Sequence, residues 1–305
     1  MTDPALQAAI AQVSAPASAG VAVRSFFDTP TNTWSHVVHC PETRRAAVID
    51  SVLDFDPASG RTATTSAQAI LDHVTAHGLT VDWHLETHVH ADHLSAAPWL
   101  CERLGGRIAV GDQIVTIQQT FGQLFNAGAD FHRDGSDFDQ LWKDGDRFAL
   151  GNLPATVLHL PGHTPACVAY LIGAAVFVGD TLFMPDYGTA RCDFPGGDAR
   201  ALYRSVRRLL ALPGETRLFM CHDYLPEGRG EYAAECTVAS QRKGNIHIHD
   251  GVEEAGFVAM REARDKTLAM PRLILPSVQV NMRAGHLPPA EGNGIRYLKI
   301  PLDAV

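Results

Sequence analysis

A short stretch of the chain, THVHADH, places three histidines and an aspartate within six positions. Imidazole and carboxylate groups are the usual protein ligands of zinc and of non-haem iron. An isolated His-x-His pair is typical of a polar loop at a strand end, but clustering more such groups costs folding energy unless a cation is bound. The spacing therefore predicts a metal site built from His88, His90, Asp92 and His93.

Three later residues could complete this site. His163 in LPGHTP, Asp180 in FVGD and His222 in FMCH each follow an apolar run. Taken singly, they have ordinary interpretations as a turn residue, a cap and a core histidine. Ligands at the ends of several strands can converge at one edge of a sheet, where rigid elements hold them. We therefore expect all three to lie beside the histidine-rich stretch.

The stretch NIHIHDG repeats the His-x-His-x-Asp pattern with His247, His249 and Asp250. No apolar strand precedes it, and the segment before it, QRKGN, is basic. We interpret it as a solvated turn and exclude it from the metal site.

The elements that must position the ligands alternate between strands and helices. Residues 34–40 and 46–52 predict two antiparallel strands around a turn, residues 65–78 a helix, and residues 81–89 the strand that leads into the histidine-rich stretch. Further strands are expected at 156–160, 167–173, 174–180 and 216–224, with helices at 198–214, 231–243 and 252–266 and a final extended stretch at 273–285. Strands with interspersed helices in both halves indicate a layered α/β fold.

Composition excludes several classes of partner. The hydrophobic fraction of 46% and charged fraction of 19% in 305 residues describe an ordinary globular protein. A net charge of −9 argues against nucleic acid and anionic membrane, and an anionic substrate would need locally placed arginines. The amino terminus lacks the features of a signal peptide, and the six cysteines are scattered, so we expect a cytoplasmic protein with reduced thiols. Residues 1–20 predict a poorly ordered lead-in or a short helix.

THVHADH, PGHTP, FVGDTL and CHDY resemble the metallo-β-lactamase superfamily in order and spacing. The resemblance implies an α/β fold, a four-layer αββα sandwich with the metal site at one edge, as a single domain over 21–305. Within that superfamily, PGHTPACV, ARCDF and VNMR look like the persulfide dioxygenases of the ethylmalonic encephalopathy type, and most like the bacterial β-lactamase-like hydrolase branch. Two departures concern the substrate: an insertion near 114–144, and Cys192 where the family's motif has threonine.

The number of metals is left open by the spacing. The whole ligand set suffices for two zinc ions that share Asp180, and it also contains a two-histidine-one-carboxylate triad suited to one Fe(II). The resemblance to persulfide dioxygenases assigns that triad to His88, His163 and Asp180. The remaining residues would support the triad or form a second metal site, namely His90, Asp92, His93 and His222.

The resemblance implies an Fe(II) enzyme, with one iron per chain, that oxidises the terminal sulfur of glutathione persulfide, or of a related persulfide, with O₂ to sulfite in sulfide detoxification. The alternative is a thioesterase of the glyoxalase II type with two Zn(II), and a non-catalytic metal sensor is a third interpretation. Arg191 is expected either to bind a substrate carboxylate or to pair with Asp193. Tyr224 either positions substrate or packs. The expected partners are a small persulfide and O₂, and a homodimer is left open.

Overall fold

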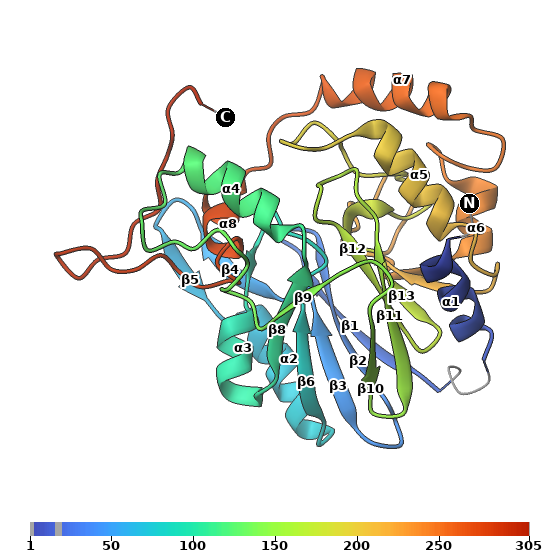
Figure 1. Cartoon of the computed structure of the whole chain (residues 1–305), viewed down its shortest axis with the longest axis horizontal. Helices are drawn as coiled ribbons and strands as arrows, with labels where there is room; N and C mark the ends of the chain where they lie inside the picture. The colour runs from blue at the N-terminus through green and yellow to red at the C-terminus, as the bar shows by residue number, and fades with distance from the viewer. Residues whose placement is uncertain (1–2, 16–19, 305) are drawn as a thin grey trace.

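Two six-stranded sheets packed face to face form the centre of the computed structural model, which describes residues 3–15 and 20–304 (Figure 1). The strand orders are β1-β2-β3-β6-β8-β9 and β10-β11-β12-β13-β14-β15. Side chains from both sheets share one core cluster, which includes Ile49 and Trp83 of the first and Tyr170 and Phe177 of the second. Because the inner faces bury each other, helices must cover the outer faces.

The first sheet is covered by two helices, α2 (Thr65–Ala76) and α3 (Ala97–Leu104). Its strands are β1 (Ala22–Asp28), β2 (Thr33–His39), β3 (Arg45–Ile49), β6 (Thr80–Leu85), β8 (Arg107–Gly111) and β9 (Gln140–Trp142). Alternation along β2 explains its apolar run, since Val38 packs between the sheets and Val37 packs under the helices. The predicted antiparallel pairing of the strands now called β2 and β3 is confirmed.

The second sheet contains β10 (Arg147–Leu150), β11 (Leu153–His159), β12 (Val168–Ile172), β13 (Ala175–Phe177), β14 (Arg217–Phe219) and β15 (Glu235–Thr237). Helices α5 (Ala199–Leu209), α6 (Val238–Gly244) and α7 (Glu254–Asp265) lie on its outer side. Leu158 and Leu171 of the sheet share a core cluster with Leu202 of α5 and Phe257 of α7. The αββα arrangement expected from the sequence is confirmed.

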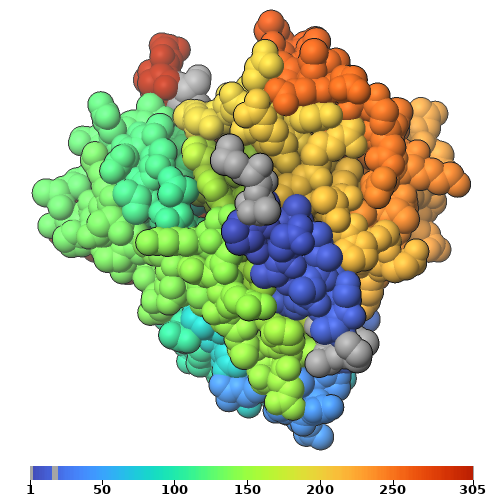
Figure 2. Space-filling model, turned by 45° about the vertical axis from the view of Figure 1, so that its right-hand side comes forward, coloured from blue at the N-terminus to red at the C-terminus, as the bar shows by residue number. Residues whose placement is uncertain are grey.

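The amino-terminal segment over 1–20 contains the short helix that was the alternative to a poorly ordered lead-in. Pro4–Val13 forms helix α1, which Figure 2 shows in blue against the green and yellow segments. The buried Gln12 side chain donates to Pro154 O at 2.9 Å and accepts from Thr156 Oγ1 at 2.7 Å. These contacts with β11 order the helix, whereas residues 1–2 and 16–19 of the predicted lead-in lie outside the described residues.

The segment 114–144 forms α4 (Ile114–Leu124), a connecting loop and β9. Its apolar side chains, such as Ile117, Phe121 and Phe138, join a core cluster with Val278. A small third sheet lies nearby and consists of β4 (Val52–Asp56), β5 (Arg61–Ala63) and β7 (Leu94–Ser95). The segment 114–144 is therefore packed against the first half of the chain and the carboxy-terminal region.

The predicted extended stretch at 273–285 is wrong, because Ile274–Asn281 is helix α8. The β-branched residues and Pro276 favoured an extended interpretation, but Pro276 lies in the first turn, where a missing N–H is tolerated. Packing of Ile274 and Val278 against the α4 region overrides the local preference. Among the described residues, this and every other helix is too short or too polar to cross a membrane.

Candidate metal centre

The predicted metal ligands lie together at one edge of the sandwich, where four strands end. His88 to His93 follow β6, and His163, Asp180 and His222 follow β11, β13 and β14. We distinguish two groups among these side chains. Within each group, the potential ligand atoms all lie within 4.8 Å of one another. We call them the triad cluster (His88, His163 and Asp180) and the second cluster (His90, Asp92, His93 and His222).

The triad cluster joins two imidazoles and one carboxylate. Asp180 Oδ2 lies 3.6 Å from His163 Nε2 and 3.9 Å from His88 Nε2. All three residues are buried, with exposed fractions of 2% for His88, 4% for His163 and 7% for Asp180. This set of donors matches the two-histidine-one-carboxylate pattern that binds non-haem iron.

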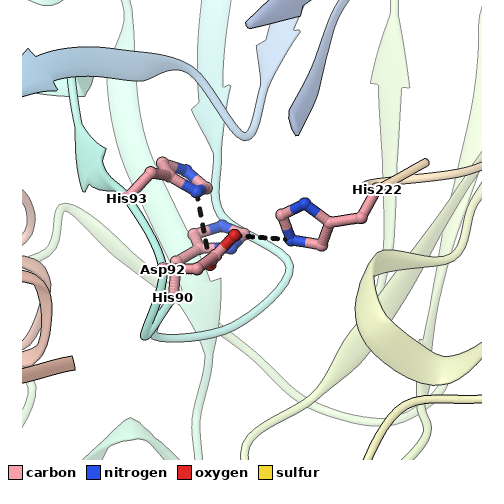
Figure 3. Close-up of side chains that lie close together, drawn as sticks. All are labelled: His90, Asp92, His93 and His222. Atoms are coloured by element: carbon pink, nitrogen blue, oxygen red, sulfur yellow. Dashed lines mark ion pairs between the residues drawn. The ribbon is translucent and has the colours of Figure 1, made fainter. Parts of the chain in front are cut away.

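The second cluster surrounds Asp92, as Figure 3 shows. Asp92 Oδ2 lies 3.1 Å from His222 Nε2, and Asp92 Oδ1 lies 3.5 Å from His93 Nδ1. His222 Nε2 is also 3.4 Å from Asp180 Oδ1, the oxygen that does not face the triad histidines. Asp180 therefore lies between the two clusters and touches both.

Hydrogen bonds determine which ring nitrogen each triad histidine presents. His163 Nδ1 lies 2.8 Å from Arg191 O, and since a carbonyl only accepts, Nδ1 carries the proton and Nε2 keeps its lone pair. Thr87 donates its hydroxyl proton to Asp50 Oδ2 and accepts from His88 Nδ1 at 3.0 Å. Burial and the neighbouring imidazoles hold the pKa of His88 well below its usual value. Both rings thus direct Nε2 toward Asp180, and the hydrogen bonds at Nδ1 fix the orientation that ligation through Nε2 needs.

The second cluster is oriented in the same way. His222 Nδ1 donates to Asn32 O at 3.3 Å, which leaves Nε2 for a ligand. His90 Nε2 faces two carboxylates, Asp50 Oδ1 at 2.9 Å and Glu86 Oε2 at 3.2 Å, which leaves Nδ1. Burial opposes protonation of His90, but Asp50 and Glu86 outweigh it and hold its pKa well above the usual value, so a metal at Nδ1 would have to displace a proton from this ring.

The free atoms of both clusters are the sign that a cation belongs here. Buried side-chain atoms without a hydrogen-bond partner, within the described ranges, include His88 Nε2, His90 Nδ1, Asp92 Oδ2, His93 Nε2 and Asp180 Oδ1. An unsatisfied buried polar group costs about 1–3 kcal/mol, so five at one point would be expensive without a partner. The imidazole-rich set suits zinc or iron rather than magnesium or calcium. The residues present therefore fit a metal ion.

A pocket of about 350 Å³ opens over the triad cluster. Aromatic side chains form one part of its wall, and Tyr224 stacks on Tyr187 with ring centroids 4.7 Å apart. Burial, together with Asp92 and Asp180, raises the pKa of Tyr224 well above its usual value, so the phenol stays protonated. Tyr224 both lines the pocket and packs, and its role in positioning substrate stays a prediction. Among the described residues, none from 114–144 lines this pocket.

Arg191 also lines the pocket, but its guanidinium is already engaged. Its Nε and Nη2 donate to the two oxygens of Asp193 at 2.6 and 2.7 Å, and its Nη1 donates to Ala269 O at 2.7 Å. The alternative of an ion pair with Asp193 is thus present in the structure. Binding of a substrate carboxylate by Arg191 stays a prediction.

The repeated pattern at NIHIHDG does not join either cluster. His249 and Asp250 are exposed, as expected for a solvated turn. The expectation is wrong for His247, which is half-buried and accepts the Thr189 N–H at 3.0 Å. Room for this ring exists because position 188 is glycine, where any side chain would overlap the imidazole.

Residues 28–222 match the family model described as the metallo-beta-lactamase superfamily. The match covers more than half of the chain and includes every predicted ligand. The chain belongs to the metallo-beta-lactamase superfamily. Both clusters therefore lie within the part of the chain that carries the superfamily's sequence pattern.

Among the superfamily's proteins, three relatives illustrate the range of similarity. The "Probable metallo-hydrolase" of Burkholderia pseudomallei (strain 1710b) is 59% identical over 93% of this chain and 99% of that protein. The beta-lactamase hydrolase-like protein of Xylella fastidiosa is 52% identical over 93% of this chain, which spans 65% of that protein's length. The mitochondrial persulfide dioxygenase ETHE1 of Homo sapiens is 29% identical over 93% of this chain and 98% of that protein.

A solved structure agrees with these superfamily relatives. The crystal structure of ETHE1 from Myxococcus xanthus superimposes with a TM-score of 0.68 and 29% identity, covering 87% of this chain and 100% of that chain. These similarities support the persulfide dioxygenase branch that the motifs suggested.

Several residues that orient this superfamily member's ligands were not identified from the sequence. Asp50 accepts from Thr87 and His90, and Glu86 faces His90 from the other side. Asn281, at the end of α8, donates to His90 O at 2.9 Å and to His93 O at 2.7 Å, which fixes the turn carrying these ligands. The VNMR motif contains Asn281, so the signal was visible, but nothing local indicated its partners.

Asp50→Asn is expected to weaken metal binding about 10- to 100-fold, as for other side chains that orient ligands. An amide replaces one acceptor oxygen with a donor, so the bonds from Thr87 and His90 cannot all form. Competition with a chelator of known affinity measures the change. Asp56→Asn is the control, since that exposed carboxylate only accepts from Ser59 and its local backbone, and equal weakening in both variants would contradict the role of Asp50.

Proposed function

We propose that the protein is a mononuclear non-haem iron persulfide dioxygenase, which oxidises the terminal sulfur of glutathione persulfide or a related low-molecular-weight persulfide. Glutathione persulfide, O₂ and water would give glutathione, sulfite and two protons. The observation that carries the proposal is the triad cluster, two imidazoles and a carboxylate around one point at the base of a pocket. The similarity to ETHE1 proteins supports the same reaction.

Iron held by His88, His163 and Asp180 would leave coordination positions open for the persulfide sulfur and for O₂. Asp50 and Thr87 orient His88, and the carbonyl of Arg191 orients His163, so the donor atoms are preorganised. Phe194 packs edge-on against His163 with centroids 5.3 Å apart and helps to exclude water from that ligand. These residues hold the reacting end of a substrate at the triad cluster.

A dinuclear zinc thioesterase of the glyoxalase II type is the second candidate. The second cluster favours it, because its free Nδ1, Nε2 and carboxylate atoms could hold another metal with Asp180 between the two. The hydrolase name of the relative that is 59% identical points in the same direction. If the protein holds a single iron, the residues of the second cluster instead surround the iron site and support its ligands.

Metal content and two activity assays separate the candidates. For the dioxygenase we expect about one iron per chain and O₂ uptake in step with sulfite release from glutathione persulfide. For the thioesterase we expect about two zinc ions per chain and hydrolysis of S-lactoylglutathione without O₂ uptake. Thioester turnover without O₂ uptake by an iron-loaded sample would contradict the proposal. Inactivity in both assays with metal bound would favour the third interpretation, a non-catalytic metal sensor.

A further inference from the structure

One wall of the pocket comes from a part of the chain outside the two sheets. The end of α7 and the connection to α8 contribute Arg264, Leu268, Ala269, Pro271, Arg272 and Leu273. Figure 1 shows this connection leaving α7 and crossing toward α8. Arg264 and Arg272 are exposed, whereas the triad cluster is buried, so the arginines lie at the outer end of the pocket.

The wall is fixed to the loop that carries Arg191. Asp265 pairs with Arg261 at 2.7 Å and accepts the Cys192 N–H at 2.9 Å. Arg191 holds the other end of the connection through its bond to Ala269 O. These contacts hold the chain at Asp265 and at Ala269. They therefore fix the backbone next to Arg264 and at the start of the segment that leads to Arg272.

Four arginines line the pocket, and they differ in whether a carboxylate neutralises them. Arg191 and Arg261 are paired with aspartates. Within the described ranges, Arg264 and Arg272 form no ion pair within 4.0 Å and no side-chain hydrogen bond. The acids that line the pocket, Asp92 and Asp180, belong to the metal clusters. The pocket mouth therefore carries two guanidinium groups without an ion pair within 4.0 Å, on a protein of net charge −9. Arg272 also borders a neighbouring hollow lined by Asp54 and Asp56, so Arg264 is the less compensated of the two.

We propose that Arg264 and Arg272 bind carboxylate groups of the substrate and so select an anionic, carboxylate-bearing thiol derivative over neutral ones. The inference rests on the proposed function for the reacting end, which lies at the triad cluster. Guanidinium groups bind carboxylates in bidentate geometry, and unpaired ones at a pocket mouth also attract anions from solution. The pocket volume of about 350 Å³ lies within the range of small-molecule sites.

Binding of S-methylglutathione to the metal-loaded protein tests the proposal, with its dimethyl ester, which keeps the α-ammonium group, as the carboxylate-free counterpart. The variants are Arg264→Gln, Arg272→Gln and the double variant. Lys266→Gln is the matched control, because that lysine is exposed on the same connection but does not line the pocket. Each single variant is expected to raise the Kd about three- to tenfold, and the double variant about 30-fold, values typical of solvent-exposed to charge-assisted pairs.

The ester is expected to bind the wild-type protein as weakly as the acid binds the double variant. In turnover, KM should rise in the double variant while kcat is retained. Equal binding of acid and ester, no measurable binding by the wild type, or equal weakening by Lys266→Gln would overturn the inference. Charge-selective binding without O₂ uptake would remove the proposed function alone, whereas O₂ uptake with an unchanged KM in the double variant would remove this inference alone.

Discussion

Asp180→Ala is expected to remove iron from the protein and to abolish turnover. Asp180 is the only carboxylate of the triad cluster, and its Oδ2 faces His163 at 3.6 Å and His88 at 3.9 Å. The two remaining imidazoles supply no negative charge to balance that of Fe(II), so the iron content should fall from about one per chain to background. The loss of turnover should exceed the roughly 100-fold effect of removing a residue that only orients a ligand.

Matched variants make this prediction specific. Asp180→Asn keeps the shape of the side chain but is expected to lose iron as well. His88→Ala is also expected to lose iron. His249→Ala is the control, since His249 is exposed and its Nδ1 donates to Asp250 O at 2.7 Å, away from both clusters. Metal analysis and O₂ uptake measure the outcome. Iron retention by Asp180→Ala, or equal loss in His249→Ala, would show that the ligands are assigned wrongly.

Gly162→Ala is expected to destabilise the fold by about 3 kcal/mol or more, the cost of forcing extra atoms into a packed interior. Gly162 has a φ of +143°, and an added Cβ would overlap the backbone N and Cα of Leu202 in α5. Neither side can move easily, because Gly162 O accepts the Asp198 N–H and Leu202 N donates to Asp198 O, both at 2.9 Å. His163 follows directly, so metal binding should weaken too.

Gly228→Ala separates backbone strain from steric overlap as causes of the destabilisation expected for Gly162→Ala. Gly228 also has a positive φ, +95°, but an added Cβ would meet no atom within 4 Å. Its cost should be confined to backbone strain of about 1 kcal/mol. Denaturant unfolding of both variants, together with their iron content, measures the difference. If the two variants unfold alike and both retain iron, the close approach of α5 is not what holds His163 in place.

Asp180 also explains why one ligand set is compatible with two chemistries. Its Oδ2 belongs to the triad cluster, while its Oδ1 lies 3.4 Å from His222 of the second cluster. One metal would use the first oxygen, and two metals would share the carboxylate. The ligand positions are the same in both cases, which is why metal stoichiometry and O₂ uptake are the decisive measurements.

Local pattern predicted the central layers well and the ends of the chain poorly. The pairing of β2 with β3 follows from two apolar runs around a short turn, which is a local signal. Helix α8 was not expected, and helix α1 was only one of two alternatives, since their order depends on packing against distant segments. Gln12 of α1 bonds to residues more than 140 positions away, and Asn281 of α8 holds His90 and His93 about 190 positions away.

The sequence by itself determined the fold family, the candidate ligand residues and their places after apolar strands. Those features are local, because residue type and strand periodicity show which side chains end each strand. Only the tertiary structure decided how the ligands divide into two clusters around Asp180, and which nitrogen each histidine presents. It also showed that Arg191 is engaged by Asp193, while Arg264 and Arg272 line the pocket mouth and form no ion pair within 4.0 Å with any described residue. These outcomes depend on hydrogen bonds and ion pairs, many of them between residues far apart in the chain, so they exist only once the sheets and helices have packed.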